Sequence, residues 1–238
     1  MEDLRKIGGE AGVVAGIALG WLVLGMMVVL PAAGLSIGDQ MNPHKLLTFI
    51  HSHGATVWMV NVLGGLLAAV MSIVLYLAIG DRFSDDEPAG ARIGALFGVL
   101  GAFAFATAAL VRQFGMGSLA SLYIANQVGA VHGFRGVSGT LSAVTALAAL
   151  FTGFAALAFA SAMVPAKQYR NTGYLALGAG AVMVLATFIP DRFLVVISQL
   201  AVGAWFAWTA LILRRESGPA YFRWQLAPRE TRSQRRAA

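Results

Sequence analysis

The chain has 238 residues, of which 58% are hydrophobic, and a formal net charge of +6. The mean hydropathy of +0.73, and apolar runs of about 20 residues that could each span a bilayer, indicate a membrane protein. The absence of cysteine excludes disulfides, thiolate metal sites, iron–sulfur clusters and covalently attached c-type haem. Most of the basic excess follows the last apolar run. Anionic lipid headgroups account for that position, so we expect no nucleic-acid partner.

Six apolar segments predict an all-α polytopic membrane protein with one six-helix domain, residues 1–213, and a basic tail, residues 214–238. The expected spans are 11–33, 54–79, 93–111, 137–163, 173–190 and 193–213. An even number of spans places both termini on one side. The 17 lysines and arginines all fall on that side except Lys45, Arg112, Arg135 and Arg192, so the positive-inside rule makes it cytoplasmic. The alanine- and glycine-rich composition is typical of a bacterial inner membrane protein.

The first and third spans carry glycine at every fourth position. The two stripes consist of Gly8, Gly12, Gly16 and Gly20, and of Gly90, Gly94 and Gly98. Such a stripe removes side chains from one helix face, so that a second backbone can approach closely. We favour packing between helices of the same chain. The alternative is a homo-oligomer or a larger membrane complex that uses the Gly12/Gly16/Gly20 face or the Gly94/Gly98 face.

The second span is expected to begin well before its apolar part. Asn42 and Pro43 are typical of a helix N-cap and first helical position. A helix from Pro43 to Ile79 would be roughly 55 Å long at 1.5 Å per residue, against a hydrocarbon core of about 30 Å. Its first turns must therefore stand outside the membrane or bend, and Gly54 is the expected bend point.

This helix carries three of the chain's four histidines, and its geometry limits what they can bind. His44 and His51 share a face, whereas His51 and His53 point about 200° apart, so the latter two cannot chelate one ion from a regular helix. His53 shares its face with Val57 and Asn61, which would direct it into the bundle above a buried amide.

The fourth histidine, His132, lies just before the fourth span, so all four are predicted at the outer mouth. The segment 113–136 is expected to form a short helix on or in the outer interface, where it could act as a lid. Two imidazoles from different helices suit haem b, with Arg112 and Arg135 as partners of the propionates and Met116 as a weaker axial candidate. A copper or zinc site built from His44, His51 and His132 is also possible.

Two other uses of the histidines stay open: interfacial side chains that bind no ligand, and a proton-linked or ligand-binding role. No carboxylate lies inside a span, which argues against a proton-driven pump. The buried polar candidates are expected to make interhelical hydrogen bonds rather than substrate contacts; they are Asn61, Ser72, Tyr76, Thr107 and Gln199.

The stretch Phe49-Ile50-His51-Ser52-His53-Gly54, with the small-residue run to Leu67, resembles small haem-binding membrane proteins of the styrene oxide isomerase type. It is also similar to the histidine-led helices of haem-copper oxidase-like proteins, and the last three spans resemble uncharacterised six-helix membrane families. The resemblance implies haem. The chain departs from the isomerase pattern in having six spans rather than four, and Asn61 lies farther along the helix than a partner asparagine would.

The sequence therefore predicts an outward-facing site built from His51, His53 and His132, with His44 less involved, that holds haem b or a transition metal ion. Whether the protein is an enzyme is left open; if it is, Asn61 or Tyr123 would orient a small apolar substrate. The alternatives are a non-catalytic accessory subunit of a membrane complex, and a lipid-, pigment- or quinone-binding protein. The tail, with Tyr221, Phe222 and Trp224 among its arginines, is expected along the inner membrane surface.

Overall fold

The structure, a computed structural model, describes residues 2–189 and 192–216, and every regular element within these ranges is helical. Six helices are long and apolar enough to cross a membrane, which confirms the prediction of an all-α polytopic protein. They span Leu4–Ala32, Gly54–Phe83, Pro88–Ala125, Gln127–Met163, Arg170–Phe188 and Phe193–Glu216. The expected link at 190–192 falls largely outside the described residues, as does the tail from 217 onward.

The first three spans are divided into shorter elements. The first consists of α1 (Glu2–Leu24), the π-helical η1 (Gly25–Val29) and α2 (Leu30–Ala32). After η2 (Asp39–Met41) come α3 (Pro43–Ser52), α4 (Gly54–Trp58), the π-helical η3 (Met59–Leu66) and α5 (Leu67–Phe83). The third comprises α6 (Pro88–Leu110), the π-helical η4 (Val111–Gly115) and α7 (Met116–Ala125). The others are α8 (Gln127–Met163), α9 (Arg170–Phe188) and α10 (Arg192–Glu216).

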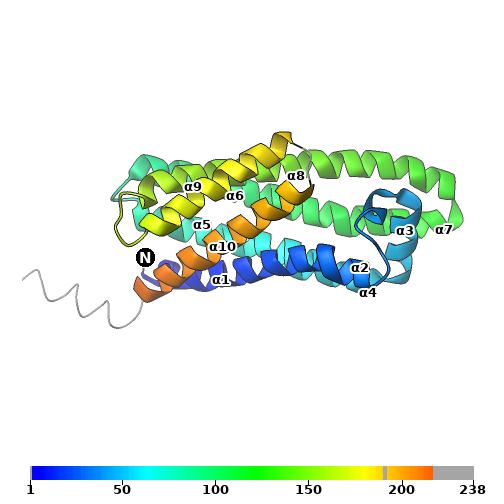
Figure 1. The fold of residues 1–238 in the computed structure, drawn as a ribbon, viewed down its shortest axis with the longest axis horizontal. Helices are drawn as coiled ribbons and strands as arrows, with labels where there is room; N and C mark the ends of the chain where they lie inside the picture. Colours follow the sequence, from blue (N-terminus) through cyan, green and yellow to red (C-terminus); the bar gives the residue numbers. More distant parts are fainter. Residues whose placement is uncertain (1, 190–191, 217–238) are drawn as a thin grey trace, which may run out of the picture.

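The helices form one elongated bundle in which α6 packs against α8, α1 against α10 and α5, and α8 against α9 (Figure 1). α9 also contacts α10, as the short link between them predicted. The centre of the packing is an aromatic cluster in which the Tyr76 ring meets Phe206 edge-on and lies parallel to Phe159, with Trp205 beside them. Burial of such large rings is the main source of side-chain packing in the bundle.

Both glycine stripes are occupied by neighbouring helices of the same chain. A Cβ on Gly12 would lie 2.7 Å from the Ala210 Cβ of α10, and one on Gly94 would lie 2.8 Å from the Phe159 ring of α8. The intrachain interpretation of the stripes is therefore the one that the contacts support. Gly20 differs, because nothing lies within 4 Å of the place where its Cβ would be.

The helix ends near the N-terminus are joined by ion pairs. Arg5 Nε donates to Asp81 Oδ2 at 2.9 Å, which links α1 to α5. Glu216 at the end of α10 accepts from Arg82 Nε at 2.9 Å and from the Tyr169 hydroxyl at 2.8 Å. Burial, and the neighbouring Glu216 carboxylate, raise the pKa of Tyr169 above its ordinary value. We call this region the inner end, after its expected side of the membrane, and the opposite region the outer end.

At the outer end the second span is interrupted as predicted. The Asn42 side chain accepts from the backbone N–H of His44 at 3.0 Å, so Asn42 is the N-cap of α3. The helix ends at Ser52, and His53, with φ −124° and ψ 35°, turns the chain before α4 begins at Gly54. Figure 1 shows α3 lying across the end of the bundle.

The segment 113–136 is not a single short helix. Its first part belongs to η4 and α7, which continue the line of α6, and its second part forms the first turns of α8. The two parts meet at Asn126, whose side chain caps α8 by accepting from the Gly129 N–H at 2.9 Å. The polar residues that suggested an interfacial helix thus occupy a helical hairpin, because η4 and α7 continue the third span beyond residue 111 and α8 begins before residue 137.

Candidate functional site

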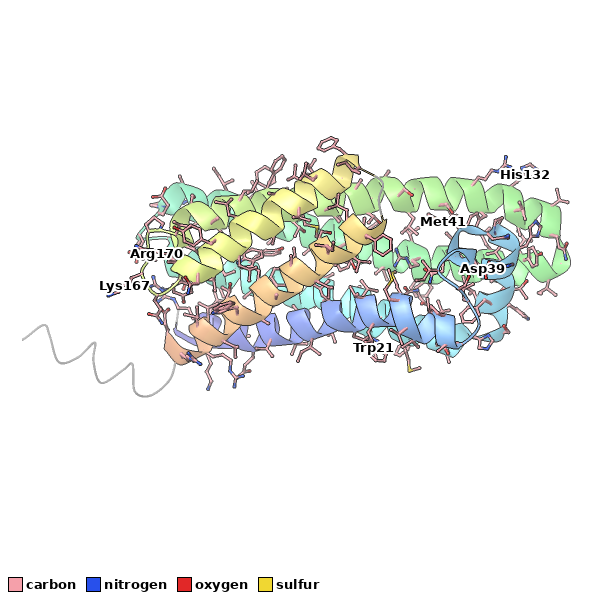
Figure 2. All side chains as sticks on the ribbon, in the orientation of Figure 1. Trp21, Asp39, Met41, His132, Lys167 and Arg170 are labelled. Carbon is pink, nitrogen blue, oxygen red and sulfur yellow. The ribbon has the colours of Figure 1, made fainter. Side chains whose placement is uncertain are left out.

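The four histidines all lie at the outer end. His44 and His51 belong to α3, His53 lies at the break between α3 and α4, and His132 lies in the first turns of α8. Figure 2 shows His132 at the end of the molecule opposite Lys167 and Arg170. All four imidazoles are exposed. Their clustering at one end follows the prediction, but their exposure means that the bundle does not enclose them.

Two of the histidines are engaged with neighbouring side chains. His44 Nδ1 and the Tyr123 hydroxyl are 2.8 Å apart, which joins α3 to α7. His53 Nδ1 lies 2.9 Å from the Ser52 hydroxyl, and its ring stacks on Phe49 with centroids 4.5 Å apart. The expectation that His53 points into the bundle is therefore wrong, because the helix breaks at this residue and its ring turns outward.

No group of three or more histidine, aspartate or glutamate side chains in the described ranges is arranged to hold a metal ion. Haem or metal binding by the histidines stays a prediction from the sequence. Arg135, expected beside a haem propionate, is exposed. Tyr123, one of the two candidate substrate-orienting residues, is buried with its hydroxyl directed to His44.

A cavity of about 630 Å³ lies between the helices, and all six spans contribute to its walls. Its volume is within the range of about 300–1,000 Å³ that is usual for small-molecule sites. The walls are mostly apolar, with Phe105, Phe134 and Phe206 among the larger side chains and four methionines, Met26, Met27, Met41 and Met116, toward the outer end. Methionine side chains adapt readily to ligands of different shape. None of the four histidines lines this cavity.

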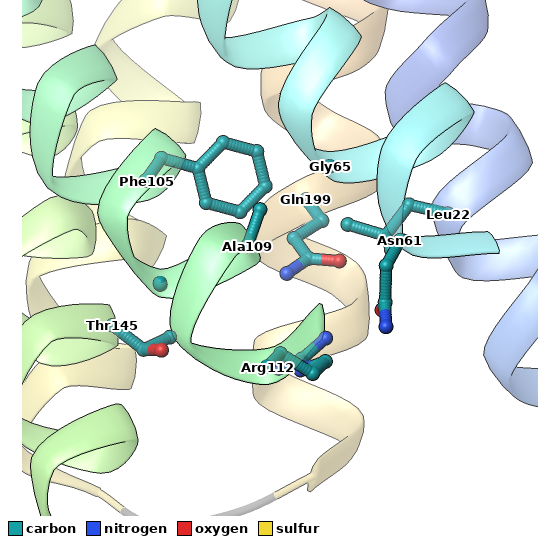
Figure 3. Close-up of a pocket in the computed structure, with 9 residues that line it drawn as sticks. Leu22, Asn61, Gly65, Phe105, Ala109, Arg112, Thr145 and Gln199 are labelled. Atoms are coloured by element: carbon teal, nitrogen blue, oxygen red, sulfur yellow. The ribbon is translucent and has the colours of Figure 1, made fainter. Parts of the chain in front are cut away.

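A small polar cluster projects into the cavity from four helices. Figure 3 shows Arg112 of η4, Asn61 of η3, Gln199 of α10 and Thr145 of α8 around the same space. We call these four residues the head cluster. Asn61 Nδ2 also donates to Gln113 Oε1 at 3.5 Å, which links η3 to η4. Arg112 is the only charged side chain lining the cavity among the residues that the structure describes.

The guanidinium of Arg112 has no hydrogen-bond or ion-pair partner within the described part of the chain. The amides of Asn61 and Gln199 lie nearby but carry no charge. An arginine placed inside a helical membrane domain normally pairs with a carboxylate or with backbone carbonyls. The site is therefore a positively charged point in mostly apolar surroundings, and it is suited to an anion.

All three π-helical segments border this cavity. η1 supplies Met26 and Met27, η3 supplies Asn61 and η4 supplies Arg112. A π-turn widens a helix locally, and such turns occur frequently at functional sites. Two of the four head-cluster side chains, Asn61 and Arg112, thus come from π-helical segments, whose irregularity a hydropathy pattern does not reveal.

The structure brings together residues that the sequence analysis kept apart. Asn61, Arg112, Gln199 and Met116 share one cavity, whereas Thr145 was missed. A signal for it was present: small polar residues recur along one face of the fourth span at positions 138, 142, 145 and 152, with helical spacing. Comparisons with protein-family models, with curated proteins and with solved structures gave no match for this chain.

Proposed function

We propose that this multi-pass membrane protein binds an amphipathic anion in the cavity between its helices. The apolar body of the ligand lies against the cavity walls, and its acidic head, a carboxylate or phosphate, meets Arg112. One observation supports this above all: among the described residues, the cavity is lined by a single charged side chain, and none of these residues pairs with it. The ligand belongs to the lipid-like class.

The chemistry of arginine favours such a ligand. A guanidinium without a counter-charge in mostly apolar surroundings is unfavourable, and an anionic ligand would offset that cost. The planar guanidinium matches carboxylate and phosphate oxygens in pairs. Asn61 and Gln199 can add neutral hydrogen bonds to the same head group without competing for the charge.

The depth of Arg112 agrees with a lipid-like ligand. Arg112 lies roughly 36 Å along the helix from Pro88, at about 1.5 Å per residue. With Pro88 at the inner headgroup level, the guanidinium is close to the outer boundary of a hydrocarbon core of about 30 Å. A lipid-like molecule would then keep its head near headgroup depth and its body within the apolar layer.

Haem or metal binding at the outer histidines is a separate prediction, supported by the position of all four at one end. Iron requires an axial ligand, and none of the four imidazoles lines the cavity, where Met116 is the one axial candidate that the sequence named. We therefore base the proposed function on Arg112 and leave the histidines to a spectroscopic test.

The test is binding of lauric acid to the purified protein in nanodiscs of zwitterionic lipid, measured by titration calorimetry. We expect Arg112→Gln to weaken binding about 10-fold or more, as loss of a charge-assisted hydrogen bond does. Arg135→Gln is the matched control, because Arg135 is exposed and does not line the cavity. Equal affinity of Arg112→Gln and the unaltered protein would refute the proposal. Mass spectrometry of co-purified lipids separates a carboxylate ligand from a phosphate ligand.

A further inference from the structure

A second polar group lies deeper in the same cavity, toward the inner end. Tyr76 of α5 and Thr152 of α8 both line the cavity and are 1% and 8% exposed. Tyr76 packs its ring against Gly98 of α6, where a side chain would collide with it. The ring is therefore fixed in place, and the position of its hydroxyl is fixed with it.

These two hydroxyls differ from those of Ser72 and Ser198, which also line the cavity. Ser72 donates to the Ala69 carbonyl at 2.8 Å, and Ser198 donates to the Val195 carbonyl at 2.7 Å, so both bond to their own helices. Tyr76 and Thr152 make no such bond to the backbone of the described residues, and they pack against Gly98 and Gly101, which lie one turn apart on α6. Each hydroxyl has one O–H donor, so a hydrogen bond between the two would use only one of the two donors. One donor remains for a further partner, which a buried polar group requires.

The spacing separates this pair from the head cluster. Thr152 lies seven residues beyond Thr145 on the same face of α8, which corresponds to roughly 10 Å along the helix. Along the second span, Tyr76 lies roughly 22 Å beyond Asn61 by the same rise. The wall between the two groups is apolar and is formed in part by Ala102, Phe105 and Ala148.

We infer that the ligand carries a second oxygen function, a hydroxyl or carbonyl at the end of its apolar body away from the acidic head, and that Tyr76 and Thr152 hold it. The ligand class is an acidic lipid-like molecule oxygenated at its far end. This inference rests on the proposed function and adds a specificity subsite to it. A plain fatty acid would bury its terminal methyl group against these hydroxyls and leave a donor without a partner.

The experiment compares lauric acid with ω-hydroxylauric acid, titrated into the protein in nanodiscs of zwitterionic lipid. In the unaltered protein we expect the ω-hydroxy acid to bind roughly three- to tenfold more tightly, the effect of one neutral hydrogen bond. The double variant Tyr76→Phe/Thr152→Val keeps the ring and the side-chain volume, and it should bind both acids equally. Tyr174→Phe is the matched control, because Tyr174 is exposed on α9 and should leave the preference intact.

The outcomes separate the two proposals. Tighter binding of lauric acid in the unaltered protein, or a preference for the ω-hydroxy acid that survives the double variant, would overturn the subsite. Arg112→Gln should weaken both acids by the same factor and leave their ratio unchanged. If Arg112→Gln weakens neither acid, the proposed function fails and the subsite fails with it.

Discussion

Two arginines in this bundle have opposite surroundings. Arg82 at the inner end is 2.9 Å from both Glu216 and Asp86, and its guanidinium lies over the rings of Phe83 and Tyr169 at 5.2 and 5.5 Å. Arg112 in the outer half has no such partner in the described chain. The same side chain therefore joins helices in one region and remains available to a ligand in the other.

The packing around these arginines differs in the same way. Near Arg82 the helices are regular, and glycines let them approach to contact distance. Near Arg112 the three π-helical segments of the described residues border a cavity, although Gly25 of η1 and Gly64 of η3 still let their helices pack closely. We expect the ion-paired inner end to contribute more to stability than the surroundings of Arg112, which contain the candidate site.

The largest expected effect comes from breaking the inner ion pair. Arg82→Gln should lower the free energy of unfolding by about 3 kcal/mol, because it leaves the largely buried Glu216 carboxylate without its cation. Thermal unfolding in detergent measures the change. Arg112→Gln is the comparison variant. Without ligand, its free energy of unfolding should be at least as large as that of the unaltered protein. Equal losses for the two variants would remove the contrast between the regions.

Glycine substitutions should show the same contrast within one helix. A Cβ on Gly16 would lie 2.8 Å from the Gly203 carbonyl oxygen, so Gly16→Ala should cost about 1–3 kcal/mol through overpacking. Gly20→Ala meets open space and should stabilise the protein by up to about 1 kcal/mol, because alanine favours the helix. Unfolding midpoints of the two variants test this, and a destabilising Gly20→Ala would mean that the space beside Gly20 is occupied.

A smaller and local effect is expected from the cap of α3. Asn42→Ala removes the acceptor for the His44 and Lys45 N–H groups and should destabilise α3 by about 1 kcal/mol. Hydrogen exchange should accelerate in the amides of α3 and stay unchanged in α9. Acceleration throughout the bundle would contradict the separation of the two regions.

The smallest structural effect is expected from the exposed histidines. His51→Ala/His53→Ala/His132→Ala should change the free energy of unfolding by less than about 0.5 kcal/mol, as exposed substitutions do. The visible spectrum gives a separate result. Any Soret band of the unaltered protein should be absent from the triple variant, and a band that persists there would refute histidine ligation.

The parts of the fold that depend on hydropathy and capping could be predicted from the sequence. The six spans, the Asn42 cap and the break beside Gly54 follow from apolar length and local backbone preferences. The head cluster could not be predicted. Asn61 and Arg112 belong to π-helical segments, where the usual angle of 100° per residue no longer gives the direction of a side chain. The outward direction of the His53 ring was missed for a related reason. His53 is itself non-helical, so its side-chain direction cannot be counted from the helical residues that follow it.

The π-helical η4 also determines how α7 is oriented relative to α6. A single residue rotates the following part of an α-helix by about 100°, so deleting one residue from η4 would turn every side chain of α7 to a new direction. Tyr123 would then face away from His44, and Met116 would leave the cavity wall. A one-residue deletion that preserves hydropathy and span length could thus abolish the ligand cavity while leaving a six-helix protein that still inserts into the membrane.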